Sequence, residues 1–240
     1  MYEDAQIKRL SEFAQKIGIS FSDPDLLCLA LTHASYPNER AVSSLESNER
    51  LEFLGDALVG LFVAEYLFEK MPETREGDLT VRRSHAVRGE ALAVAARRIG
   101  IGDYLILGNG ERNAGGYDRT SNLAGAFEAL VGAIALDAGE GEAREFVLCA
   151  LAEEISAAMD PSAGKDPKSL LQEYLQARAI ALPEYVVIEG AGTESVRLWR
   201  MEVLIKGESI ATGEGRRKVD AERRAAEVAL AALTRDDSKS

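Results

Sequence analysis

The sequence predicts a mostly α-helical domain over residues 1–160, followed by a small α+β domain over residues 166–235. Through the first domain apolar residues recur at helical spacing, and turn-forming and flexible residues at 161–165 are typical of a linker. After residue 166 the pattern changes to helix, strands and helix, because residues 199–206 alternate apolar with polar side chains. We expect residues 236–240 to form a polar tail.

The first domain is expected to consist of helices joined by short loops. Apolar spacing predicts a helix at residues 7–17, which Gly18 ends. Asp23 is expected to be the N-cap of a second helix, with Pro24 at its first position. A polar loop at residues 37–47 leads to a third helix. Further helices are predicted at residues 82–99, 121–137 and 142–159.

The helix that begins near Asn48 carries three acidic residues on one narrow strip. At roughly 100° per residue, Glu49, Glu52 and Asp56 lie within about 60° of one another. Like charges at this spacing repel each other on a helix, so a divalent metal ion would relieve the cost; an ordinary solvated face is the alternative. The opposite, apolar arc is expected to be buried. Its residues are Phe53, Leu54, Ala57, Leu58 and Leu61.

The string from Asn48 to Gly60, Asn-Glu-Arg-Leu-Glu-Phe-Leu-Gly-Asp-Ala-Leu-Val-Gly, resembles the signature of the bacterial ribonuclease III family of double-strand-specific RNA endonucleases. Similar segments elsewhere extend the resemblance over roughly residues 7–233. It implies a ribonuclease III-type helical bundle and a homodimer. It also implies Mg²⁺-dependent hydrolysis of double-stranded RNA, with Mn²⁺ as a substitute ion, leaving 5′-phosphate and 3′-hydroxyl ends. The family acts in ribosomal and messenger RNA precursor processing and in RNA decay.

The resemblance implies that Glu52, Asp56 and Glu128 hold the metal, with Asp56 and Glu128 as the catalytic residues. In the family, the helix that carries Glu128 also has an Asp three residues earlier, and Gly125 occupies that position here. Because the surrounding residues match, we interpret Gly125 as a substitution that removes a ligand, which Gly125→Asp would restore. The alternative function is therefore a catalytically weakened or inactive double-stranded RNA-binding protein of the same fold.

Roles are also expected for several other residues of the first domain. Glu49 and Glu76 are assigned to the outer shell of the metal or to RNA contact; a helix-start carboxylate is the alternative for Glu76. His33 is interpreted as a structural histidine that holds a helix end, in preference to a catalytic role. For the homodimer, we expect Val59 and Val63 to contribute apolar surface beside the acidic strip.

The second domain resembles a double-stranded RNA-binding domain in its α-β-β-β-α order and in the string Asp-Pro-Lys-Ser-Leu-Leu-Gln-Glu-Tyr-Leu-Gln from Asp166. Such domains read the A-form shape, 2′-hydroxyls and phosphates of RNA. By resemblance, the residues that face a minor groove are Ser169, Gln172 and Gln176, and those that bind phosphates at a helix start are Arg216, Arg217 and Lys218. Val219 and Asp220 replace basic residues, and the loop at 190–197 lacks a histidine, so we expect weaker binding than is typical.

The charge distribution is compatible with RNA binding in spite of a net charge of −12. Residues 166–240 carry 12 Lys and Arg against 13 Asp and Glu, so nearly all of the surplus lies in the domain with the acidic strip. We expect no membrane segment, signal peptide, disulfide, zinc site or small-molecule cofactor, and we expect a cytoplasmic protein.

Overall fold

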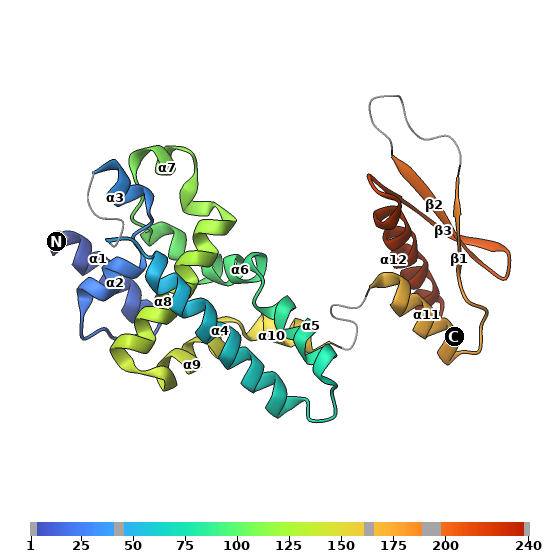
Figure 1. Cartoon of the computed structure of the whole chain (residues 1–240), viewed down its shortest axis with the longest axis horizontal. Coiled ribbons are helices and arrows are strands. Elements are labelled where there is room, and N and C mark those ends of the chain that lie inside the picture. Colours follow the sequence, from blue (N-terminus) through green and yellow to red (C-terminus); the bar gives the residue numbers. More distant parts are fainter. Residues whose placement is uncertain (1–3, 41–45, 161–165, 189–197, 238–240) are drawn as a thin grey trace. The chain divides into compact units, whose positions relative to one another are not determined.

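The computed structural model describes residues 4–40, 46–160, 166–188 and 198–237 (Figure 1). The predicted linker at 161–165, the loop at 190–197 and the end of the predicted tail lie outside these ranges. The chain divides into two units, residues 1–163 and 164–240, and each unit has its own apolar core.

The first unit is a bundle of helices organised around α8 (Thr120–Ala138), whose residues are buried over most of its length. The long helix α4 (Glu49–Lys70) packs against α8, and the two run side by side in Figure 1. The other helices of this unit are α1 (Asp4–Lys16), α2 (Pro24–Ala30), α3 (Ser35–Glu39), α5 (Glu76–Ala86), α6 (Gly89–Ile99), α7 (Asn109–Asn113), α9 (Glu140–Ala150) and α10 (Ala152–Met159).

Local sequence signals set several helix ends as predicted. The Asp23 carboxylate accepts hydrogen bonds from the backbone N–H of Asp25 (3.0 Å) and Leu26 (3.4 Å), which confirms it as the N-cap of α2 with Pro24 in the first turn. Gly18, with φ 78°, adopts the left-handed conformation just after α1. Such conformations favour glycine because it lacks a Cβ.

Two predicted helices are each divided in the structure. The segment 82–99 belongs to α5 and α6, which separate at Val87 and Arg88, and the segment 142–159 belongs to α9 and α10, which separate at Leu151. The reason is tertiary, because α6 and α9 pack against α8 whereas α5 and α10 pack against each other. The predicted loop at 37–47 begins inside α3.

The buried face of α4 also differs from the prediction. Phe53 is 81% exposed and Leu61 is 47% exposed, so the arc expected to be buried lies largely on the surface. The side chains that enter the core are Leu51, Val59, Phe62, Val63 and Leu67. Apolar side chains extend around more of α4 than one neighbouring helix can cover, and the approach of α8 decides which of them are buried.

The second unit is a three-stranded antiparallel sheet with helices α11 (Pro167–Ala177) and α12 (Lys218–Asp237). Its strands are β1 (Glu184–Val187), β2 (Trp199–Ile205) and β3 (Glu208–Gly215), in the order β1-β2-β3. The alternation in β2 is confirmed, because Met201, Val203 and Ile205 enter the core. α12 extends to Asp237 and so takes up the first part of the predicted tail.

Among the described residues, α8 has the length and apolar composition to cross a membrane, but 61% of its apolar window is buried inside the protein. This burial is typical of the central helix of a bundle. Cys28 is buried, Cys149 is exposed, and both are free thiols.

Candidate active site and RNA-binding surface

Glycines bring α4 and α8 together at the centre of the first unit. A Cβ at Gly55 would lie 1.7 Å from the carbonyl oxygen of Glu128, and a Cβ at Gly132 would lie 2.5 Å from the carbonyl oxygen of Leu51. No side chain fits at such distances, so the two backbones can approach this closely only because both positions are glycine. The close approach sets the first turns of α4, with their acidic strip, beside the middle of α8.

This packing brings Glu52 and Asp56 of α4 close to Glu128 of α8. Partial burial, followed by the charges of Asp56 and Glu52, raises the pKa of Glu128 from 4.5 to about 7. Partial burial also raises the pKa of Glu52, with further contributions from Glu49 and Asp56. The charges of Glu52 and Asp56 therefore disfavour the ionised form of Glu128, and the charge of Asp56 disfavours that of Glu52.

In the part of the chain that the structure describes, no basic side chain pairs with this cluster. Within the described ranges, Glu52, Asp56 and Glu128 form no ion pair with Lys, Arg or His. The same ranges contain no group of three or more His, Cys, Asp or Glu side chains already gathered around one metal position. A set of hard carboxylate oxygens without a counter-charge suits a divalent ion such as Mg²⁺, which keeps several waters and needs few protein ligands. The residues present therefore fit such an ion, and the side chains would have to converge when it binds.

Glu49 lies at the edge of this cluster. Its carboxylate accepts a hydrogen bond from the Ser47 hydroxyl (3.0 Å), and its charge contributes to the raised pKa of Glu52. Nearby, Nδ1 of His33 lies 2.9 Å from the Ser35 hydroxyl oxygen, which accepts a hydrogen bond from the backbone N–H of Gly108 (2.9 Å). These bonds fasten the start of α3 to the loop before α7 and support a structural role for His33.

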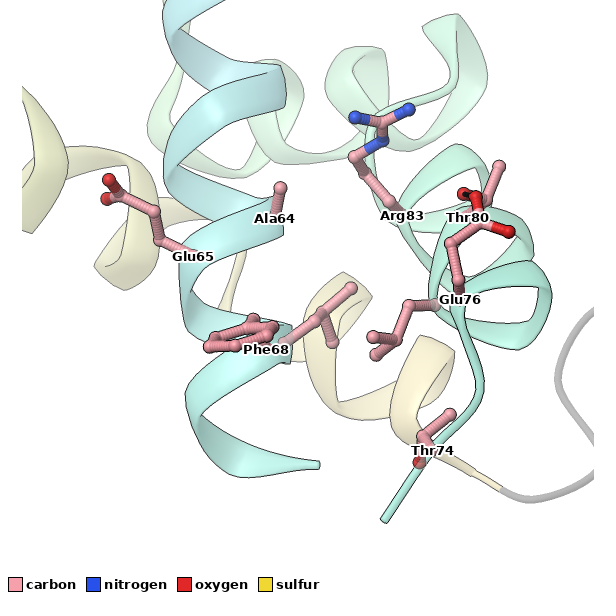
Figure 2. A pocket seen from close by; sticks show the side chains of 9 residues that line it. Ala64, Glu65, Phe68, Thr74, Glu76, Thr80 and Arg83 are labelled. Carbon is pink, nitrogen blue, oxygen red and sulfur yellow. Dashed lines mark hydrogen bonds between the residues drawn. The ribbon is translucent and has the colours of Figure 1, made fainter. Parts of the chain in front are cut away.

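Glu76 lies at the start of α5, in a different environment. It lines a cavity of about 520 Å³ between the second half of α4 and α5, together with Ala64 and Phe68, as Figure 2 shows. The Thr80 hydroxyl donates a hydrogen bond to the Glu76 carboxylate (3.1 Å). No hydrogen bond or ion pair joins Glu76 to the carboxylate cluster in the described part of the chain.

An exposed apolar stripe on α4, two of whose three residues the sequence analysis expected to be buried, leads from the acidic strip towards this cavity. Phe53 (81% exposed), Leu61 (47%) and Phe68 (72%) lie on one face of the helix, at spacings of about two turns. The sequence does carry a signal for this stripe: apolar residues cover a wider arc of α4 than contact with one neighbouring helix requires. Val59 and Val63, the residues expected at a dimer interface, are 1% and 0% exposed and belong to the core of their own chain, so that expectation was wrong.

The predicted RNA-binding residues of the second unit all lie on its surface. Ser169, Gln172 and Gln176 are exposed on one face of α11, at positions i, i+3 and i+7. Ion pairs from Lys168 to Glu222 (2.6 Å) and from Arg223 to Asp166 (2.6 Å) join the start of α11 to the first turns of α12. The polar face of α11 and the basic start of α12 are therefore held next to each other.

The basic start of α12 is partly neutralised by an acidic residue of the same turn. Arg216, Arg217 and Lys218 are exposed, but the Arg217 guanidinium donates two hydrogen bonds to the Asp220 carboxylate (2.8 and 2.9 Å). These bonds lower the pKa of Asp220 and raise that of Arg217. In the sequence, Asp220 stands where a basic residue was expected. The structure shows in addition that its carboxylate pairs with Arg217, one of the three basic residues that remain.

Comparisons with known proteins identify the family of each unit. A family model described as ribonuclease-III-like matches residues 23–155, and one described as a double-stranded RNA binding motif matches residues 167–233. Ribonuclease 3 of Ectopseudomonas mendocina is 46% identical over 227 residues, which cover 93% of this chain and 95% of that protein. Ribonuclease 3 of a Pseudomonas fluorescens strain is 45% identical over 226 residues, with the same coverage.

A solved structure shares the fold of the first unit. It is the nuclease domain of ribonuclease III from Campylobacter jejuni, described for structural flexibility in the region involved in dimer formation. It is 37% identical with a TM-score of 0.56, and the match covers 60% of this chain and 97% of that one.

Proposed function

The chain belongs to the ribonuclease III-like family and is an endoribonuclease for double-stranded RNA, and we propose that it cuts with a divalent ion held by Glu52, Asp56 and Glu128. One observation supports the site: partial burial and the charges of Asp56 and Glu52 on α4 raise the pKa of Glu128 on α8 to about 7, and none of the three forms an ion pair with a basic side chain among the described residues. Mutual repulsion of this kind favours binding of a cation.

We propose Mg²⁺ as the ion and Mn²⁺ as its substitute, because carboxylate oxygens and water suit both. When bound, the ion would supply a water acidic enough to attack phosphorus and would offset charge on the leaving 3′-oxygen. With a pKa of about 7, Glu128 is partly protonated at neutral pH, and a cation held there would favour its ionised form. Asp56 and Glu128, on facing helices, would hold the ion, and the positive charge of the ion would attract the scissile phosphate. We propose that hydrolysis leaves 5′-phosphate and 3′-hydroxyl ends.

We propose that the second unit supplies duplex recognition. Ser169, Gln172 and Gln176 present a hydroxyl and two amides that can donate to and accept from 2′-hydroxyl groups in a minor groove. Arg216, Arg217 and Lys218 stand at the N-terminus of α12, where backbone N–H groups and basic side chains can both contact phosphate. Such contacts recognise the shape and charge of an RNA duplex and not its base sequence. We therefore propose that the substrates are duplex regions of ribosomal and messenger RNA precursors in the cytoplasm.

We propose a homodimer in which the apolar stripe on α4 is covered by a second copy. A two-fold axis across α4 would place the first half of each helix against the second half of the partner's helix. Phe53 of one protomer would then enter the cavity that Ala64, Phe68 and Glu76 line in the other. The dimer would bring Glu76 close to the partner's acidic strip, which would give it the outer-shell role predicted from the sequence.

Gly125 favours a second candidate, a weakened or inactive RNA-binding protein of the same fold. Cleavage of a perfect RNA duplex over a Mg²⁺ titration separates the two. We expect the unchanged chain to cut, Glu128→Gln to lose at least about 100-fold in rate, and Glu145→Gln, an exposed change on α9, to cut normally. Binding of the duplex without cleavage at any Mg²⁺ concentration would favour the second candidate.

A further inference from the structure

Two ion pairs cross between α11 and α12, close to the residues proposed to contact RNA. The Lys168 ammonium lies 2.6 Å from Oε2 of Glu222, and Nε of Arg223 lies 2.6 Å from Oδ2 of Asp166. Each helix contributes one acidic and one basic side chain, so the group carries no net charge. Asp166 is also the N-cap of α11, because its carboxylate accepts a hydrogen bond from the backbone N–H of Lys168 (2.9 Å). We call these four residues the helix clamp.

Glu222 is the most enclosed member of the helix clamp. Its side chain is 14% exposed, and its second oxygen lies 4.0 Å from the ammonium of Lys218, one of the residues proposed to bind phosphate. The Lys168 ammonium also lies 4.6 Å from the centre of the Tyr185 ring, which belongs to β1. The pair of Lys168 and Glu222 is therefore held by contacts from three elements of the same unit.

The apolar contact between α11 and α12 leaves their offset along the helix axes weakly defined. Among the described residues of α12, the fully buried side chains are all alanines: Ala221, Ala225, Ala226 and Ala229. These small side chains share one core with Leu171 and Leu175 of α11. Apolar contact is non-directional, whereas a charged hydrogen bond requires a defined geometry. The Tyr174 hydroxyl bonds the carbonyl of Leu233 (3.2 Å) at one end of the helices, and the helix clamp sets the offset at the other.

We propose that Glu222 and Lys168 are positioning residues, which hold the polar face of α11 and the basic start of α12 at the offset that an A-form duplex requires. The inference rests on the proposed recognition of RNA by these two surfaces. Domains of this class contact a minor groove and the phosphates of the neighbouring major groove at once, so the separation of the two surfaces must match the duplex. A domain that holds this separation before binding loses less conformational entropy when it binds.

The helix clamp gives Glu222 a different effect from the other acidic residues of α12. Asp220 and Glu227 pair with arginines of the same helix, so neutralising them does not change the offset between helices. Electrostatics alone predicts that the loss of an acidic residue near a phosphate site raises affinity for RNA. Positioning predicts the opposite sign for Glu222, because its loss lets the two contact surfaces move apart.

Filter binding of the full chain to duplex RNA in the presence of a chelator measures affinity without cleavage. We expect Glu222→Gln to weaken binding by roughly 5-fold, against the direction that its charge predicts. Asp166→Asn tests the second pair, because asparagine keeps the N-cap of α11 and removes the charge that faces Arg223. It should also weaken binding. Glu227→Gln is the matched control and should not weaken binding, because its pair lies within α12.

A double-mutant cycle separates positioning from direct contact with phosphate. If Lys168 acts through Glu222, adding Lys168→Met to Glu222→Gln should cause no further loss of affinity. If the Lys168 ammonium itself contacts phosphate, the added change should lower affinity again and reduce the salt dependence by about one phosphate contact. Lys168→Arg, which can keep the ion pair, should bind like the unchanged chain.

The sign of the change in affinity decides the inference. Equal or tighter binding by Glu222→Gln would overturn it and leave the proposed RNA recognition standing, and a further loss in the double variant would overturn it as well. Failure of the unchanged chain to bind duplex RNA would overturn the recognition and the inference together. Circular dichroism at the temperature of the binding measurement shows whether each variant is folded, and Asp166→Asn decides the question if Glu222→Gln is not.

Discussion

At the scale of single residues, the half-buried carboxyl of Glu128 has a consequence for stability. Its pKa is about 7 in the folded protein and near 4.5 in the unfolded chain. Between these values the folded state keeps a proton that the unfolded state has lost, so the stability of the ion-free protein falls as pH rises from 4.5 to 7. Above pH 7 both states are ionised at this residue, and the stability does not fall further for this reason.

Glu128→Gln should remove this pH dependence. Between pH 5 and pH 8 the stability difference should shift in favour of the variant by about 1 kcal/mol, a value reduced for solvent screening of a half-exposed group. Thermal unfolding in the presence of a chelator at both pH values measures the shift, and Glu145→Gln should show none. A shift in the opposite direction would contradict the raised pKa.

Asp220 is the second residue whose effect can be measured. Asp220→Asn releases the Arg217 guanidinium from its two hydrogen bonds, so we expect affinity for duplex RNA to rise by roughly 2–5-fold. Filter binding at several salt concentrations should also show a steeper salt dependence. Glu227→Gln is the matched control, because it breaks the similar pair with Arg224 (2.9 Å) on the same helix. Unchanged affinity for Asp220→Asn would mean that Arg217 does not contact phosphate.

At the scale of elements, the exposed stripe on α4 is expected to hold the dimer together. Phe53→Ser should shift the chain towards monomer at micromolar concentration, because most of that aromatic surface is exposed in the single chain. Sedimentation velocity measures the shift. Leu136→Ser, at a 61% exposed residue of α8 off the stripe, should leave the dimer intact. An unchanged chain that sediments only as a monomer would exclude the dimer.

At the scale of the whole molecule, two separate cores predict two separable activities. Residues 1–160 alone should still bind the ion and dimerise. Their affinity for duplex RNA should be much lower than that of the full chain, and this binding should depend less on salt concentration. Residues 166–235 alone should bind duplex RNA and not duplex DNA, because the 2′-hydroxyl is part of what they read. Equal binding of both duplexes by residues 166–235 would refute the proposed recognition.

The sequence by itself determined most of the order of the secondary elements, the acidic strip and the family. These features depend on residues that are neighbours along the chain. Asp23 caps the helix that starts at the next residue, and apolar and polar side chains alternate within the seven residues of β2. The string from Asn48 to Gly60 is contiguous, so it can be read without knowing what packs against it. The assignment of the metal to Glu52, Asp56 and Glu128 remains a prediction.

Only the tertiary structure decided which faces of these elements are used. The predicted buried arc of α4 was wrong because Gly55 and Gly132, far apart in the sequence, let α8 approach another side of the helix. The same approach buried Val59 and Val63 and left Phe53 on the surface. Only the fold places the Glu52 carboxylate beside Gly125, and the interpretation of Gly125 as a missing ligand stays a prediction. Burial at these positions depends on how closely segments far apart in the sequence approach each other. The order of residues along one helix does not reveal that distance.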